Sequence, residues 1–238
     1  MKDIKLYCQP AYNYDKNTID YLEILVREYQ GCESVYSVMQ YIKNNNKEVS
    51  FDLAVLSETL RILNEHRKLD IPVGINLMPV TMEQAGIAEK IVKIIHENNK
   101  SGNEIIIEIN EDTDFSHKNV INNARVFNDN NIKIALDDFG IDNANLMVLL
   151  MYKVDILKVD KKFIDTNNED ELEESQAAIL KALRSIIRDL HIKHIVEGIE
   201  SKKQLQEVKS LGYSVVQGYV YKIPIPFEKV IQDINKGD

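Results

Sequence analysis

The chain has few of the residues that build cross-linked or membrane-embedded proteins. Its 238 residues contain two cysteines, Cys8 and Cys32, which are too few for a disulfide framework or a zinc site made of cysteines. No apolar run approaches the roughly 20 residues that a membrane-spanning helix needs. The first residues, MKDIKLYCQP, do not form a signal peptide, because charged residues precede only a short apolar segment. These absences predict a cytoplasmic protein with no membrane partner.

Positive charge is also scarce. Lysine and arginine number 29 against 38 aspartates and glutamates, which gives a formal net charge of −9. An acidic surface disfavours non-specific binding to an anionic membrane or to polymeric nucleic acid. It does not exclude an anionic ligand, provided that cations lie between the ligand and the protein.

Several familiar catalytic motifs are missing. The sequence has no G-x-S-x-G segment and no P-loop, and its DFG at 138–140 lacks the other elements of a protein kinase. Neither cysteine has an obvious histidine partner. His191 and His194, just before an apolar run, are interpreted as surface residues. The sequence therefore does not indicate covalent catalysis by a serine or cysteine.

Short apolar runs alternate with amphipathic segments along the chain. In residues 51–69, for example, leucines recur at helical spacing on one stripe. Strands that alternate with helices predict mainly parallel pairing with right-handed crossovers. The short connection between the first two runs, which includes NYDKNT at 13–18, is too short for a helical crossover, so one antiparallel pairing is expected there. Predicted strands cover 4–12, 21–28, 73–79, 104–111, 133–140, 156–164, 193–200 and 215–220; predicted helices cover 51–69, 85–99, 119–131, 174–190 and 201–212, with Gly212 as the C-terminal cap.

Eight strands in a chain of this length favour a closed barrel over an open doubly wound sheet. We therefore predict an α/β fold, a modified TIM-like (β/α)8 barrel with one antiparallel strand near the N-terminus. No linker, low-complexity tract or short repeat divides the chain. A single domain over residues 1–238 is expected.

Polar side chains recur where the predicted strands end. In a parallel barrel, the carboxyl ends of the strands converge on one rim, where active sites are built. One polar residue there would carry no information, but a ring of them is hard to explain by solvation alone. The ring consists of Asn76, Glu108, Glu111, Asp137, Asp138, Lys158, Asp160, Glu197, Glu200 and Gln217.

The doubled aspartate of KIALDDFG sharpens this prediction. Taken alone, Asp137 and Asp138 are better explained by capping of the next helix and by solvation than by a metal site. Within a ring of carboxylates and an amide, they are hard oxygen ligands that suit Mg²⁺ or Mn²⁺, and Ca²⁺ less specifically. Two cations about 3.5–4 Å apart could hold the attacking water and the leaving oxygen of a phosphodiester. Lys158 and Arg27 would add positive charge toward the phosphate.

Eight segments in register resemble the EAL domain, the bacterial phosphodiesterase module that linearises cyclic di-GMP. The naming motif is present as EILVR, in which Ile24 replaces the middle alanine. The resemblance spans residues 9–226, so the chain is similar to a free-standing EAL domain. The other segments are CQPAY, INLMP, IEINE, LDDFG, DILKVD, VEGIES and VQGYVYKIPIP.

The resemblance implies a function and a role for each site residue. The expected reaction is hydrolysis of one phosphodiester of cyclic di-GMP to linear pGpG, with two Mg²⁺ or Mn²⁺ ions; a homodimer is left open. Glu197 matches the general base, and Lys158 matches a group that holds the water or the phosphate. The metal ligands would be Glu23, Asn76, Glu108, Asp137 and Asp138; the substrate contacts would be Gln9, Leu25, Arg27 and Gln217; the supporting residues would be Glu111, Asp160 and Glu200.

One loop departs from the family pattern. The family commonly reads D-D-F-G-T-G-Y-S-S-L, whereas this chain reads DDFGIDNANL, with Asp142 in place of the second glycine. Asn110 replaces a threonine nearby and is expected to change a partner of this loop. The altered segment 141–146 predicts a low basal activity and keeps open a catalytically silent module that binds cyclic di-GMP or a protein partner. An unrelated magnesium-dependent barrel is the remaining alternative, and it requires the register of the eight segments to be coincidental.

Overall fold

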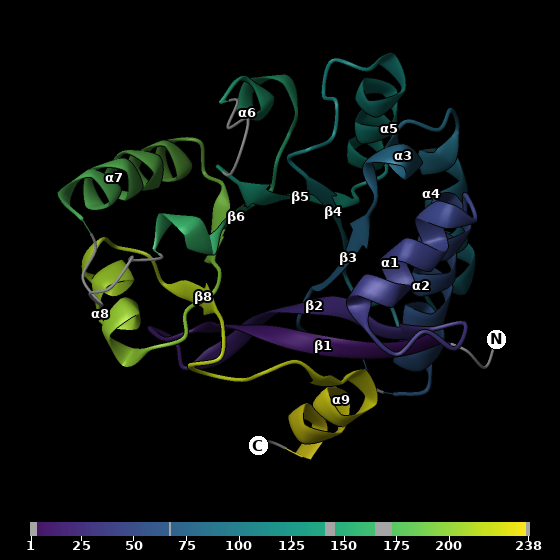
Figure 1. Ribbon diagram of the computed structural model, residues 1–238, viewed down its shortest axis with the longest axis horizontal. Helices are drawn as coiled ribbons and strands as arrows, with labels where there is room; N and C mark the ends of the chain where they lie inside the picture. Colours follow the sequence, from purple (N-terminus) through teal and green to yellow (C-terminus); the bar gives the residue numbers. More distant parts are fainter. Residues whose placement is uncertain (1–3, 67, 141–145, 165–172, 237–238) are drawn as a thin grey trace.

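The computed structural model describes residues 4–66, 68–140, 146–164 and 173–236. Strands β1 to β8 close into a ring in which β2 to β8 run parallel, while β1 is antiparallel to both β2 and β8. This confirms the predicted barrel and its antiparallel N-terminal strand (Figure 1). A further strand, β9, pairs with β1 outside the ring. The strands are β1 (Ile4–Asn13), β2 (Thr18–Tyr29), β3 (Val73–Leu77), β4 (Ile105–Asn110), β5 (Lys133–Phe139), β6 (Ile156–Val159), β7 (Lys193–Val196), β8 (Val215–Gln217) and β9 (Ile225–Pro226).

Helices surround the ring. Helices α1 to α5 lie on the side of β3 and β4, α7 and α8 lie on the side of β6 and β8, and α9 lies against β1 (Figure 1). The five predicted helices are present, whereas α1, α3, α6, α9 and β9 were not predicted. None of the helices in the described ranges is long and apolar enough to cross a membrane. The helices are α1 (Val35–Asn44), α2 (Glu48–Asn64), α3 (Pro79–Met82), α4 (Ile87–Asn98), α5 (Lys118–Asp129), α6 (Met147–Met151), α7 (Glu174–Asp189), α8 (Lys202–Ser210) and α9 (Phe227–Lys236), with a 3₁₀ turn at Lys161–Phe163.

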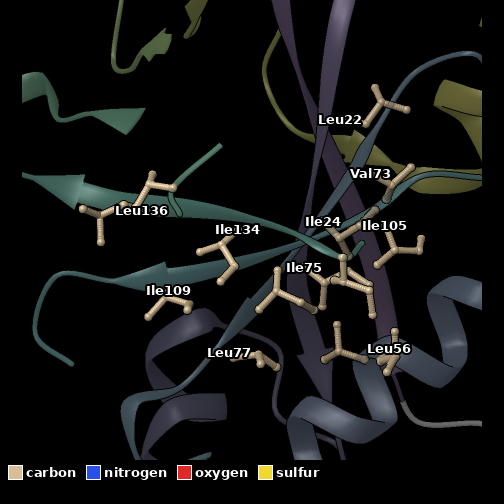
Figure 2. Packing of buried hydrophobic residues seen from close by; sticks show 14 of the residues in the cluster. Leu22, Ile24, Leu56, Val73, Ile75, Leu77, Ile105, Ile109, Ile134 and Leu136 are labelled. Carbon is tan, nitrogen blue, oxygen red and sulfur yellow. The ribbon is translucent and has the colours of Figure 1, made fainter. Parts of the chain in front are cut away.

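Each barrel strand has two buried faces with different partners. On β4, Ile105, Ile107 and Ile109 belong to the large core between strands and helices, whereas Ile106 belongs to a small separate cluster inside the ring. Successive side chains of a strand point to opposite faces, so Glu108 faces the interior with Ile106. Figure 2 shows the outer core, where side chains of β2 to β5 meet those of α2.

The interior of the barrel has two layers. The lower layer is apolar and consists of Ala11, Tyr21, Ile106, Ala135, Ile156 and Ile195, with Val215 packed against them. Two residues further along each parallel strand, and two residues earlier on the antiparallel β1, lies a polar residue. Gly74 and Asn76 occupy the same two levels on β3. We call this second set the upper layer: Gln9, Glu23, Asn76, Glu108, Asp137, Lys158, Glu197 and Gln217.

Two local predictions have opposite outcomes. Gly212 follows the last turn of α8 with a φ of +85°, a left-handed conformation that glycine adopts at low cost, so the predicted helix end is confirmed. The interpretation of His194 as a surface residue is wrong, because it is only 8% exposed. Its ring meets Tyr213 edge-on, and its Nε2 accepts a hydrogen bond from the Ser214 backbone N–H at 3.0 Å. His191 is exposed, as expected.

Candidate metal centre

Lys158 lies at the middle of the upper layer. Its side chain is 1% exposed, and its ammonium group is surrounded by carboxylates from four other strands or strand ends. Burial of an ammonium group removes its hydration, and charged partners must offset that cost. The distances from Lys158 Nζ are 2.6 Å to Glu108 Oε2, 2.8 Å to Asp137 Oδ1, 2.9 Å to Glu197 Oε1 and 3.4 Å to Glu23 Oε2.

The charges in this cluster do not balance. Four carboxylates face one ammonium group, so ionisation of all of them would leave three negative charges in a buried space. Burial, together with Glu23 and Asp137, raises the pKa of Glu108 to about 8 against the attraction of Lys158. Burial also raises the pKa of Glu197 well above its ordinary value. Burial lowers the pKa of Lys158, but the carboxylates outweigh this effect and hold it well above the usual value.

Divalent cations would fit this donor set. Oxygen atoms of Glu23, Glu108 and Asp137 lie within 4.8 Å of one another, and so do those of Asp137, Asp138 and Glu197. Asp137 belongs to both groups, so two adjacent cations could share it. Both groups consist of carboxylates, whose oxygens suit Mg²⁺ or Mn²⁺, and two such ions would offset the uncompensated negative charge.

The backbone explains how two adjacent aspartates can serve one centre. In a regular strand, Asp137 and Asp138 would point to opposite faces. The pairing of β5 with β6 shifts register between Leu136 and Phe139, and Asp138 has a φ of +56°. An irregular strand with a left-handed residue re-aims a side chain. Both carboxylates therefore reach the same group of ligand atoms.

Neighbouring loops hold this irregular strand end. Asn110 Nδ2 donates a hydrogen bond to Asp138 Oδ2 at 2.6 Å, and the Gly140 backbone N–H donates to Glu111 Oε2 at 2.7 Å. Burial, followed by repulsion from Asp137, raises the pKa of Asp138 to about 6. Asn110 is thus the direct partner of Asp138, and Glu111 braces the start of the following loop. Residues 141–145 of the divergent loop lie outside the described residues.

Amide side chains surround Glu23. Gln217 Nε2 donates to Glu23 Oε2, and Asn76 Nδ2 lies 3.3 Å from Glu23 Oε1. Gln9 Oε1 accepts from Gln217 Nε2 at 3.5 Å, while Gln9 Nε2 donates to the carbonyl of Lys222 at 3.1 Å. The predicted site residues Gln9, Glu23, Asn76 and Gln217 therefore lie together.

A cavity of about 380 Å³ opens onto these groups, within the size range of small-molecule sites. Asp160, 8% exposed, lines it and also accepts a hydrogen bond from the Lys162 backbone N–H at 2.8 Å. Glu200 is exposed and also lines it, directly before Ser201, the N-cap of α8. The full lining is Gln9, Glu23, Leu25, Asp137, Asp138, Asp160, Lys161, Glu197, Gly198, Glu200, Gln217, Gly218 and Tyr219.

Of the predicted substrate contacts, Arg27 is the one that is not among the described residues lining the cavity. It falls at a register shift between β1 and β2, and its Nη1 donates to the carbonyl of Val26 at 3.3 Å. Leu25, two residues earlier, lines the cavity.

Three side chains of the described site were not predicted, and the backbone of Gly198 and Gly218, which also lines the cavity, was not predicted either. Lys161 and Tyr219 line the cavity, and Tyr219 is 60% exposed. Tyr21 donates its phenol to Glu108 Oε1 at 2.9 Å from the lower layer. Its position two residues before Glu23 on an alternating strand places both side chains on one face, and that spacing was the available signal.

A closed barrel with an acidic, lysine-centred cluster at the carboxyl ends of its parallel strands defines the class of the protein: an α/β barrel whose clustered carboxylates could hold divalent cations. The chain belongs to the EAL domain family, whose model matches residues 1–224. It is 30% identical over 232 residues to the probable cyclic di-GMP phosphodiesterase PdeA of Escherichia coli K12, covering 94% of this chain and 31% of that protein. It is 26% identical to the cyclic di-GMP phosphodiesterase PdeL of the same organism, covering 97% of this chain and 65% of PdeL.

Solved structures share the fold. An EAL domain protein from Listeria monocytogenes EGD-e superposes with a TM-score of 0.80 at 23% identity, covering 97% of this chain and 92% of that one. The PaMucR phosphodiesterase in complex with c-di-GMP gives 0.81 at 22% identity, covering 95% and 99%. The manganese and cy-diGMP complex of Klebsiella pneumoniae BlrP1 gives 0.81 at 19% identity, covering 93% and 56%.

Proposed function

We propose that this chain is a metal-dependent phosphodiesterase that hydrolyses one phosphodiester of cyclic di-GMP to give linear pGpG. The observation that carries the proposal is the upper layer, in which Asp137 belongs to two overlapping groups of carboxylate ligands around Lys158. The named phosphodiesterase relatives support the substrate. The chain spans about a third of PdeA and about two thirds of PdeL, so any activity of their remaining parts is not carried over.

Two groups of side chains would hold the cations. Glu23, Asn76, Glu108 and Asp137 would bind one ion, and Asp138, with Asp137, would bind the second. When bound, Mg²⁺ or Mn²⁺ would supply Lewis-acid activation of water and phosphate. Gln217 and Asn76 would orient Glu23 by donating to its two oxygens.

Glu197 is the proposed general base. It follows β7 at the level of the ligand cluster and lines the cavity. Its Oε1 would accept the proton of the attacking water while the water oxygen bonds to phosphorus and one ribose oxygen leaves. Burial raises the pKa of Glu197, so its ionised form is a stronger proton acceptor than an exposed carboxylate. Lys158, 2.9 Å from that oxygen, would hold the carboxylate in place and then neutralise charge on the phosphate.

Gln9 and Leu25 would contact the dinucleotide, because both line the cavity beside the ligand cluster. Arg27 would reach a phosphate as a bidentate donor. Its present hydrogen bond is to a backbone carbonyl, so the guanidinium would exchange this contact for the phosphate.

The test is product analysis with a matched pair of variants. The purified chain is incubated with cyclic di-GMP and Mn²⁺ or Mg²⁺, and pGpG is resolved by chromatography. Glu197→Gln keeps the shape of the side chain but removes the proton acceptor, so turnover should fall by about 10²–10⁴-fold while cyclic di-GMP still binds. Glu174→Gln, on the exposed first turn of α7, removes the same charge outside the ligand groups and the cavity lining and should turn over like the parent.

Two results would decide against the proposal. Hydrolysis by Glu197→Gln at the parent rate would reject the base assignment. Tight binding of cyclic di-GMP by the parent without product, under both metals, would identify a silent binding module instead.

A further inference from the structure

Tyr21 connects the two layers of the barrel interior. Its side chain is 1% exposed and its ring belongs to the lower apolar cluster. Its phenol oxygen reaches the upper layer and donates to Glu108 Oε1 at 2.9 Å. The other oxygen, Glu108 Oε2, receives the ammonium of Lys158 at 2.6 Å. Both oxygens of this fully buried carboxylate are thus held by different donors from opposite sides of the barrel.

The neighbouring strand leaves room for this contact. A Cβ atom at Gly74 would lie 1.9 Å from Tyr21 Oη and 2.0 Å from Glu108 Oε1, distances that no packed structure tolerates. Gly74 pairs with Glu23 on one side and with Ile106 on the other. The absence of a side chain at position 74 therefore makes space for the hydrogen bond between Tyr21 and Glu108.

We infer that Tyr21 is a positioning residue of the metal centre, which fixes the Glu108 carboxylate through its phenol and thereby sets the affinity for divalent cations. The inference rests on the proposed metal-dependent function and extends it to a residue outside the ligand set. A ligating carboxylate must turn its free lone pairs toward the ion, and hydrogen bonds from outer groups set that orientation. Glu108 shares a ligand group with Glu23 and Asp137, so its rotation would disturb that entire group.

The alternative role for Tyr21 is to fill the barrel interior. A filling role needs the ring and not the hydroxyl group, so Tyr21→Phe separates the two roles. Tyr213 provides a matched control, because it is fully buried and donates its phenol to the Leu180 backbone carbonyl at 2.9 Å outside the barrel interior. Tyr213→Phe removes an equally buried hydroxyl group without touching a carboxylate.

The experiment measures Mn²⁺ binding to the metal-free full chain by isothermal titration calorimetry, with thermal melts of each variant. Tyr21→Phe should bind Mn²⁺ about 10–100-fold more weakly, and Tyr213→Phe should bind it like the parent, although both lose a buried hydrogen bond. Equal Mn²⁺ affinity of Tyr21→Phe and the parent would overturn the inference. If the parent binds Mn²⁺ but forms no pGpG, the proposed function fails while the Tyr21 comparison still holds; a parent that binds no Mn²⁺ overturns both.

A second measurement covers a Tyr21→Phe variant that does not fold. A 3-fluorotyrosine placed at position 21 keeps the ring and the donor, and its ¹⁹F resonance reports the phenol environment. Titration with diamagnetic Mg²⁺ should shift this resonance with the dissociation constant that a calorimetric titration with Mg²⁺ gives. A resonance that stays in place while Mg²⁺ saturates the protein would refute the positioning role.

Discussion

The two interior layers of the barrel are built on the same strands but have opposite chemistry. On β7, Ile195 lies in the lower layer and Glu197 lies two residues further; on β6, the same pair is Ile156 and Lys158. Two residues advance a strand by about 7 Å, so the interior changes from apolar to charged within that distance. Alternate residues of each strand thus face the interior. Their position along the strand decides whether they pack in the apolar layer or join the charged cluster.

The layers also contribute opposite terms to stability. Full burial of an isoleucine stabilises a fold by about 1.5–3 kcal/mol, whereas removing an ion from water costs several kcal/mol that its partners must offset. In the upper layer, one ammonium group faces four carboxylates. The lower layer therefore stabilises the barrel, and the upper layer is held in place at a cost that bound cations would relieve.

The largest effect is expected from Lys158→Met. This change keeps the stem volume but removes the only cation among the described groups of the upper layer. Loss of one partner from a buried ion cluster typically destabilises a protein by about 3–5 kcal/mol. Denaturant unfolding in EDTA, which removes bound cations, should show this loss. Lys202→Met, on the exposed face of α8, serves as the control and should unfold like the parent.

A loss below about 1 kcal/mol for Lys158→Met would mean that the upper layer does not depend on its central charge. Added Mn²⁺ sharpens the test. A ligand that binds only the folded state stabilises it, so Mn²⁺ should raise the free energy of unfolding of the parent and of the variant.

Ile195→Ala tests the lower layer with a somewhat smaller effect. The side chain is 2% exposed, and truncation of such a residue costs about 2–5 kcal/mol through lost burial and the cavity left behind. Mn²⁺ affinity should stay at the parent value, because the apolar side chain of Ile195 cannot form a hydrogen bond with any of the proposed metal ligands. Ile179→Ala, at a 52% exposed position of α7, should change stability by less than about 0.5 kcal/mol. A large loss of Mn²⁺ affinity in Ile195→Ala would show that the layers are not independent.

Much of this division was predictable from the sequence. The apolar runs mark the strands, and the polar residues at their ends predicted that Glu108, Asp137, Lys158 and Glu197 would meet. Because successive side chains of a strand point to opposite faces, these residues could be assigned to the interior face without locating the helices. Their roles as ligands, base and substrate contacts remain predictions.

Contacts that depend on backbone irregularity or on neighbouring strands were not predictable. Two adjacent aspartates in a strand should diverge, and only the positive φ of Asp138 brings them to one centre. The hydrogen bond between Tyr21 and Glu108 needs the space beside Gly74, which no local pattern announces. Helix α1 buries only Val38 and Ile42, and such a narrow apolar stripe does not predict a helix.

The smallest expected effect lies on the opposite face of β7, where His194 alternates with Ile195. Burial, assisted by Arg184, lowers the pKa of His194 to about 4, whereas an unfolded chain has a histidine pKa of about 6.5. The unfolded state therefore binds this proton more tightly, so stability is lost as pH falls below about 6.5. From pH 8 to pH 5 the two pKa values give a loss of about 2 kcal/mol.

His194→Gln keeps a group that can accept the Ser214 N–H but cannot titrate, so the difference in unfolding free energy between the variant and the parent should change by that amount over this range. Titration of the interior carboxylates is common to both proteins and cancels in that difference. A difference that is independent of pH would show that His194 does not titrate as a buried, neutral ring, and would place the pH response of the barrel in its upper layer instead.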